Sequence, residues 1–152
     1  MSMTSRAAYL VAPALALLLS ACAPGTGGGP ATTAGAALPS GSTLEARWER
    51  RVVTLLVAER IADACYGEGI YLAPSPYGGA VHRATEELVA AGEDRAALNA
   101  VFAAHDFDTT TAAVERYLAS RGGSVEAPAS LCAVGATEIA EGSEVGKVLT
   151  KL

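Results

Sequence analysis

The chain has 152 residues, of which 51% are hydrophobic and only 5% aromatic, and its formal net charge is −5 at pH 7. This acidic balance argues against a nucleic-acid partner, because nucleic-acid-binding domains normally carry a basic patch or stripe. A core with so few aromatic residues must be built mainly from Leu, Val, Ile and Ala, whose small side chains suit closely spaced helices.

An apolar run from Ala7 to Leu19 follows a start whose only charge is Arg6, and Ser20-Ala21-Cys22 comes directly after it. The run is too short for a membrane-spanning helix, which needs about 20 apolar residues. Small residues directly before a cysteine resemble the signal of bacterial lipoproteins, in which the preceding peptide is removed and the cysteine is lipidated. Residues 1–21 are therefore predicted to be a cleaved signal peptide and Cys22 the lipidation site, with an ordinary secretory signal as the alternative.

The lipoprotein resemblance implies a durable membrane anchor, because such proteins carry several acyl chains and stable anchoring takes at least two. Ala23, rather than aspartate, follows the cysteine. In the sorting rule of this class, that residue implies the inner leaflet of the outer membrane, facing the periplasm. From Ala23 to Gly41 the chain is Gly, Ala, Pro, Thr and Ser apart from Leu38. Residues 22–42 are therefore predicted to be a flexible linker, because this composition cannot bury enough apolar surface to offset ordering entropy.

Residues 43–152 are predicted to form one domain of the all-α class, a small bundle of about five helices. Ser42 and Glu45 form a capping box, which predicts a first, central helix that runs to about Ala64 with two apolar stripes. Capping and glycine patterns predict further helices over 81–91 and 94–104, then from a cap at Asp108 to about Ser120, and a last one from Pro128. Almost no sheet is expected, because no stretch sustains period-two alternation. The core positions predicted for the three middle helices are Ala84, Leu88, Leu98, Val101, Phe102, Val114, Tyr117 and Leu118.

The segment from Tyr66 to Gly79 contains four glycines, two prolines and three tyrosines, and is predicted to be an ordered loop. Aromatic, proline-rich loops are rigid and often form binding surfaces. Tyr66, Tyr71 and Tyr77, with Trp48 of the first helix, are therefore candidate binding residues around a small-molecule pocket. The alternative is that the tyrosines cover the helix ends and that Trp48, on the main apolar stripe, is a core residue.

Cys65 and Cys132 are the two cysteines that remain once Cys22 is lipidated. Two thiols in a small exported domain usually form a disulfide, which here would join the end of the first helix to the start of the last. A redox or metal-binding pair is the alternative. It lacks Cys-x-x-Cys spacing, an electropositive setting and histidines at ligand spacing.

The stretch after Cys132 places small residues at helical spacing, and glycine costs up to ~1 kcal/mol in a helix interior. Either a neighbouring backbone approaches closely, or the helix breaks near Gly142-Ser143 before a short terminal helix. The stretch resembles the end of a family of small exported alphaproteobacterial proteins known only as a domain of unknown function, and the similarity spans about residues 50–152. Glu138 is expected on the helix surface, with a buried carboxylate as the alternative that the sequence leaves open. The residues that carry the resemblance are Cys132, Gly135, Glu138, Ile139, Gly142, Ser143, Gly146 and Lys147.

No catalytic constellation, metal site or cofactor is predicted. His105 with its neighbouring aspartates could share a metal, but it more simply ends one helix while Asp108 caps the next. His82 and Glu86 are spaced as an exposed helix pair. The favoured interpretation is a non-enzymatic, membrane-anchored envelope lipoprotein whose helical domain contacts an envelope protein or cell-wall component. A small-molecule binder that uses the tyrosine loop, and a hydrolase or redox enzyme, are the alternatives.

Overall fold

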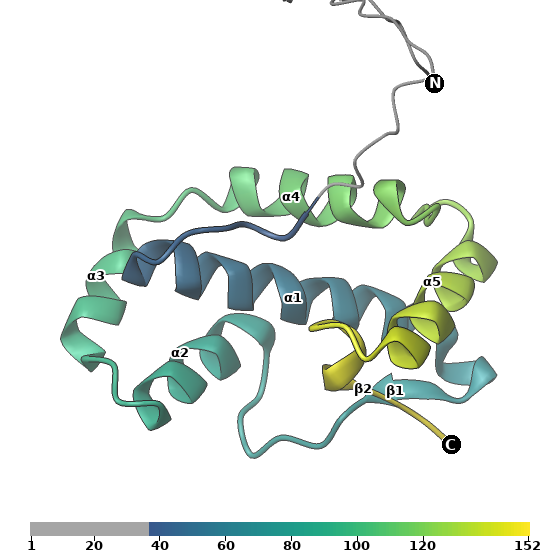
Figure 1. The fold of residues 1–152 in the computed structure, drawn as a ribbon, viewed down its shortest axis with the longest axis horizontal. Helices are drawn as coiled ribbons and strands as arrows, with labels where there is room; N and C mark the ends of the chain where they lie inside the picture. The colour runs from purple at the N-terminus through teal and green to yellow at the C-terminus, as the bar shows by residue number, and fades with distance from the viewer. Residues whose placement is uncertain (1–36) are drawn as a thin grey trace, which may run out of the picture. The chain divides into compact units, whose positions relative to one another are not determined.

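The computed structural model describes residues 37–152; the predicted signal peptide, Cys22 and the linker up to residue 36 lie outside them. These described residues form five α-helices, two short 3-10 turns and one two-stranded sheet (Figure 1), which confirms the predicted all-α fold. The elements in chain order are α1 (Leu44–Cys65), η1 (Tyr66–Glu68), β1 (Ile70–Leu72), α2 (Ala80–Ala90), α3 (Arg95–Ala104), α4 (Phe107–Ser120), α5 (Pro128–Glu141), η2 (Gly146–Val148) and β2 (Leu149–Lys151).

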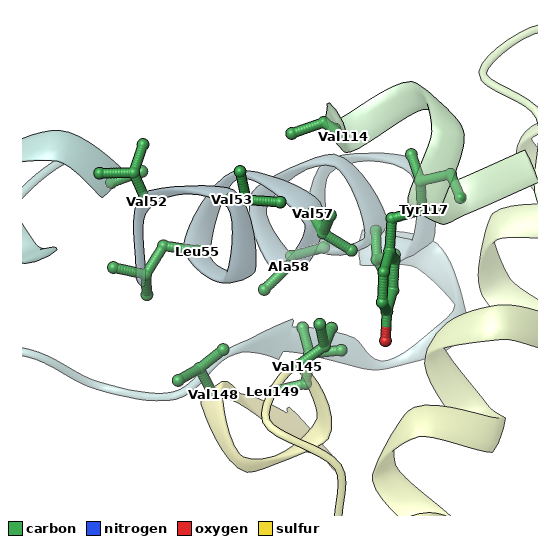
Figure 2. Close-up of a cluster of buried hydrophobic side chains, with 14 of the residues drawn as sticks. Val52, Val53, Leu55, Val57, Ala58, Val114, Tyr117, Val145, Val148 and Leu149 are labelled. Atoms are coloured by element: carbon green, nitrogen blue, oxygen red, sulfur yellow. The ribbon is translucent and has the colours of Figure 1, made fainter. Parts of the chain in front are cut away.

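Helix α1 is the central element, as the two apolar stripes predict, and it contacts the other four helices as well as β1. Figure 2 shows valines of α1 between two layers of side chains. Val114 and Tyr117 of α4 lie on one side, and Val145, Val148 and Leu149 lie on the other. Val52, Val53 and Val57 are all wholly buried, so α1 has apolar contacts around most of its circumference.

The caps of α1 and α4 differ from the predicted ones. Thr43, not Ser42, caps α1: its Oγ1 accepts a hydrogen bond of 3.1 Å from the backbone N–H of Ala46. Asp106, not Asp108, caps α4, and its carboxylate accepts bonds of 3.0 Å from the N–H of Asp108 and the hydroxyl of Thr109. In both places two capping residue types lie close together, and the pattern alone does not decide which of them stands outside the helix.

The C-terminal stretch contains a strand where a short helix was expected. Helix α5 ends at Gly142, whose φ of 61° is left-handed, so the predicted break is confirmed. One 3-10 turn follows, and then β2 pairs antiparallel with β1, with Leu149 opposite Leu72. The predicted terminal helix is wrong because a three-residue strand is too short to show alternation, and its pairing depends on a partner far away in sequence.

Five of the eight predicted core positions are buried, Leu88 and Val101 are partly buried, and Phe102 is exposed. Ala84, Leu98 and Leu118 are at most 1% exposed, whereas Phe102 is 48% exposed and is therefore not a core residue. Phe102 lies at the surface beside Phe107, with ring centroids 5.7 Å apart. Both rings meet Trp48 edge-on, so their inner edges cover the buried indole.

Candidate functional site

The most unusual side chain of the domain is Glu138, which is wholly buried in α5. The favoured prediction of a surface position is therefore wrong, and the alternative of a buried carboxylate is confirmed. Buried positions of α5 recur at helical spacing, and Glu138 continues a stripe formed by Leu131, Val134 and Gly135. The face of α5 that packs against the core therefore includes an ionisable residue at a position that an apolar residue would normally occupy.

Three side chains satisfy the Glu138 carboxylate. The Tyr117 hydroxyl and the Arg121 Nε both donate to Oε1 at 2.8 Å, and the Ser143 hydroxyl donates to Oε2. Arg121 also binds Glu141 through Nη2 at 2.9 Å, at the surface. A buried charge is tolerated when it is paired and hydrogen-bonded, and Glu138 meets both conditions.

The surroundings also fix the protonation of Tyr117 and Arg121. Burial raises the pKa of Tyr117 to about 12, and the nearby Glu138 carboxylate adds to this effect against the opposing influence of Arg121. The Tyr117 hydroxyl and the charge of Glu138 raise the pKa of Arg121, against the effect of burial. Tyr117 therefore keeps the proton that it donates to Glu138 at any physiological pH.

Two glycines of the family pattern leave room for close contacts, Gly146 with the backbone of α5 and Gly135 with the side chain of Ile61 in α1. A Cβ at Gly146 would lie 1.9 Å from the carbonyl oxygen of Glu138, and a Cβ at Gly135 would lie 2.5 Å from Cγ2 of Ile61. The Ser143 hydroxyl accepts a bond of 2.9 Å from the N–H of Gly146 while it donates to Glu138. We call Tyr117, Arg121, Glu138, Ser143 and Gly146 the C-terminal clamp, since they hold the segment after α5 against α4 and α5.

The clamp contains three residues of the family pattern, and other residues of that pattern have structural roles around it. Gly142 supplies the left-handed turn that ends α5. The backbone N–H of Lys147 donates to the carbonyl of Ser143 at 2.9 Å, and Lys147 itself is exposed. Ile139 is partly buried against the core. Because Glu138 has no exposed surface, a substrate cannot reach its carboxylate in this arrangement.

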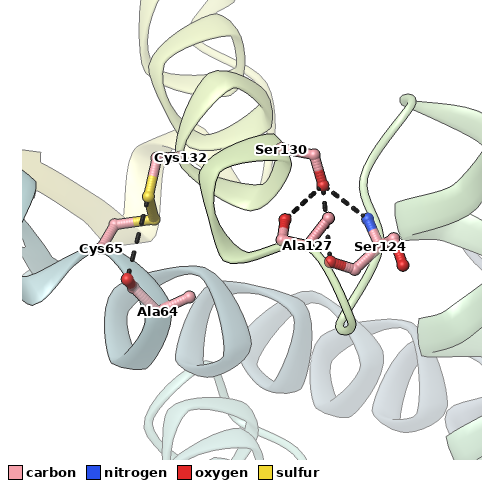
Figure 3. The surroundings of a disulfide bond; sticks show 6 residues. All are labelled: Ala64, Cys65, Ser124, Ala127, Ser130 and Cys132. Carbon is pink, nitrogen blue, oxygen red and sulfur yellow. Dashed lines mark hydrogen bonds between the residues drawn. A yellow bond between two sulfur atoms is a disulfide. The ribbon is translucent and has the colours of Figure 1, made fainter.

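The predicted disulfide is confirmed, and Figure 3 shows it between the end of α1 and the second turn of α5. Cys65 and Cys132 have Cα atoms 5.4 Å apart. The start of α5 is fixed further by Ser130, whose Oγ donates to the carbonyl of Ala127 at 2.7 Å and accepts from the N–H of Ser124 at 2.9 Å. The bond thus holds two helices whose ends are also ordered by local hydrogen bonds.

The candidate binding residues do not border one pocket. Tyr66 and Tyr71 lie together beside an open groove of about 390 Å³, which is lined by these two residues, Ala62, Asp63 and Leu72. Tyr77 packs instead against the ring of His82, with centroids 6.2 Å apart. Trp48 is wholly buried and binds Thr85, so the alternative prediction of a core residue is confirmed for it.

Helix geometry explains why Trp48 cannot reach the groove. Trp48 is in the second turn of α1 and Tyr66 directly follows its last residue. At 1.5 Å rise per residue the two Cα atoms are roughly 27 Å apart. Tyr71 reaches the end of α1 because the pairing of β1 with β2 holds it there, an arrangement that the loop composition does not encode.

The two histidines lie apart from the clamp. His82 is exposed on α2, with Nδ1 4.0 Å from Glu86. His105 ends α3 as predicted, and its Nε2 is 2.5 Å from the hydroxyl of Thr110. Over residues 37–152, no group of three potential ligands is placed to hold a metal ion. Within the same range, no helix combines the length and the apolar character that crossing a membrane requires.

The fold and the clamp define a small helical domain. One disulfide joins its first and last helices, and the buried carboxylate of Glu138 joins α4, α5 and the segment after α5. The family model of DUF5333, described as a family of unknown function, matches residues 44–150, and the chain belongs to that family. The match extends from the first residue of α1 into β2, and the resemblance to a family of unknown function is confirmed. The chain has no match among curated proteins or solved structures.

Proposed function

We propose that this protein is an exported lipoprotein, anchored through Cys22 to the periplasmic face of the outer membrane. Its helical domain is a non-enzymatic interaction module for an envelope protein or a cell-wall component. The observation that carries the proposal is Leu19-Ser20-Ala21-Cys22 directly after a short apolar run. The Cys65–Cys132 disulfide supports export, because disulfides form and persist in oxidising compartments such as the bacterial periplasm.

The non-enzymatic character is supported by the way the polar groups are used. The domain's buried carboxylate is fully engaged by Tyr117, Arg121 and Ser143 and has no exposed surface. A surface that a partner could reach is instead the open groove at the end of α1, which is lined in part by Tyr66 and Tyr71. Exposed aromatic rings beside polar groups are typical of protein interaction surfaces.

Metabolic labelling with an alkyne analogue of palmitate, followed by membrane fractionation, tests the anchor. The native chain should take up the label and sediment with the outer membrane. The Cys22→Ser variant should lose the label, and the matched Ser20→Ala variant, which keeps a small residue before the cysteine, should retain it. An unmodified amino terminus in the cytosol would overturn the proposal.

The interaction module is tested by capture from solubilised envelopes on the immobilised native chain. A partner that is retained by the native chain and released by soluble competitor is the expected result. A protein that stays monomeric and without partners across ionic strengths and detergents would contradict this part of the proposal.

A further inference from the structure

We infer that Asp63, Tyr66 and Tyr71 form a recognition site for an arginine side chain of a protein partner in the envelope. The inference rests on the proposed function, because it supplies the partner chemistry that an interaction module needs. Asp63 lies on the last turns of α1, Tyr66 opens η1, and Tyr71 is the middle residue of β1. The three side chains line one groove, together with Ala62 and Leu72.

The two tyrosines form a corner of ring faces. Their centroids are 5.1 Å apart and their planes meet at 83°. Tyr66 is 71% exposed, the most exposed of the large aromatic side chains in the described part of the chain, so its ring is open to a ligand. A cation over the face of a tyrosine is attracted by the ring quadrupole, and perpendicular aromatic rings are the usual way to enclose an organic cation.

Asp63 gives the groove a carboxylate that forms no ion pair within the part of the chain that the structure describes. No cationic side chain among residues 37–152 lies within ion-pairing distance of Asp63, whereas Glu86, Glu87 and Glu144 each bind an arginine. Glu59 lies one turn earlier on the same helix. Burial raises its pKa, and the charge of Asp63 adds to the effect, although Arg60, Arg83 and the N–H of Ala80 oppose it. Arg83 is already bound to Glu87 and to the carbonyl of Ala73.

These features favour a guanidinium group over other cations. A guanidinium is planar, stacks on aromatic faces and binds a carboxylate with two parallel hydrogen bonds, and an ammonium group lacks this geometry. A stacking surface and a bidentate acceptor therefore line the same groove.

The shape of the groove favours a cation carried by a protein. Sites for free small molecules enclose most of the ligand surface. Here the groove is open and one of its lining residues is the largely exposed Tyr66, so a free ligand would remain in contact with water on one side. An arginine that projects from a protein surface avoids this problem, because the rest of the partner covers the open side.

Tyrosine-selective NMR on the purified full chain tests the site. The chain has five tyrosines, so the ring signals of Tyr66 and Tyr71 can be assigned by substitution, and Tyr77 and Tyr117 serve as internal controls. The probe is Nα-acetyl-arginine methylamide at millimolar concentrations, compared with its neutral citrulline counterpart and with choline. The signals of Tyr66 and Tyr71 should shift with the arginine probe, and by at least twofold less with citrulline.

Variants separate the contributions. Tyr66→Ala should weaken the arginine response by roughly two- to fivefold, the range of an exposed cation–π contact. Asp63→Asn should weaken it by up to roughly fivefold, the range of an exposed ion pair. Glu126→Gln, at an exposed acidic residue away from the groove, should leave the response unchanged.

The inference would be overturned by equal responses to arginine and citrulline, by equal shifts at Tyr117, or by an unchanged response in Asp63→Asn. A response to choline stronger than to arginine would also overturn it, since the site would then suit a lipid headgroup or a free quaternary amine. The titration does not involve Cys22. Failure of palmitate labelling therefore counts only against the proposed anchor, and failure of the titration only against the arginine site.

Discussion

Glu138 and Glu141 contact the same guanidinium from opposite environments, and this difference gives a matched test of the clamp. Glu138 is 0% exposed, whereas the side chain of Glu141 is 49% exposed. Glu138→Ala should lower the free energy of unfolding by about 3 kcal/mol, because it leaves Arg121 and Tyr117 without their buried partner. Urea unfolding followed by circular dichroism measures the loss.

The control for this prediction is Glu141→Ala, which should cost less than about 1 kcal/mol, as expected for a solvent-exposed ion pair. Equal losses in the two variants would mean that Glu138 is not the buried member of the pair. Ser143→Ala should fall between them, because it removes one hydrogen bond to the buried carboxylate.

Tyr117 gives the clamp a dependence on alkaline pH. Its pKa is raised from 10.0 to about 12, so the folded state holds the phenolic proton more tightly than the unfolded state does. This contribution to stability is fully present below pH 10 and is lost as the pH rises from about 10 to about 12. Urea unfolding at several pH values should show a steeper fall over this interval in the native chain than in Tyr117→Phe; identical slopes would contradict the prediction.

Whether a single side chain is buried or exposed is the property of this fold that the sequence predicts least well. The spacing of Leu131, Val134 and Gly135 identifies the buried stripe of α5, but a glutamate on that stripe is normally assigned to the surface. A signal was present in Tyr117 and Arg121, which lie four apart on α4 and can reach one partner. Phe102 shows the opposite difference: it is predicted to be a core residue but is half exposed. An apolar residue can cover a buried ring with one edge and still face the solvent with the other.

At the level of elements, the start of α1 allows a direct test of the observed cap. Thr43→Ala should lower the free energy of unfolding by about 1 kcal/mol, because the N–H of Ala46 loses its acceptor. Ser42→Ala should have almost no effect, since Ser42 is exposed and makes no capping bond to α1. A larger loss in Ser42→Ala, measured by thermal unfolding, would restore the capping box predicted from the sequence.

The helices themselves could be predicted because their signals are local. Capping residues, glycines and Pro128 give the bounds of five helices to within a few residues, and two apolar stripes identify α1 as the central one. The sheet could not be predicted. Each strand has three residues, and each depends on a partner about 80 residues away, so no local pattern records the pairing.

For the whole molecule, the disulfide should be the largest single contribution to stability. Cys65 and Cys132 are separated by 67 residues, and closing a loop of this length contributes roughly 4 kcal/mol in the chain-entropy model. Domains of this size have about 5–15 kcal/mol in total. The urea midpoint should therefore fall sharply on reduction, and a Cys65→Ala, Cys132→Ala double variant should be equally weak with and without reductant.

The two-sided burial of α1 has a consequence for the order in which the domain is assembled during synthesis. α1 is made first, but the side chains that cover one of its faces come from α4, and those that cover another come from α5 and the segment Val145–Leu149. A growing chain therefore exposes a bare, valine-rich helix until nearly all of the domain has emerged. Such a chain depends on delayed folding, as in export of an extended polypeptide, or on a chaperone that shields those valines in the interval.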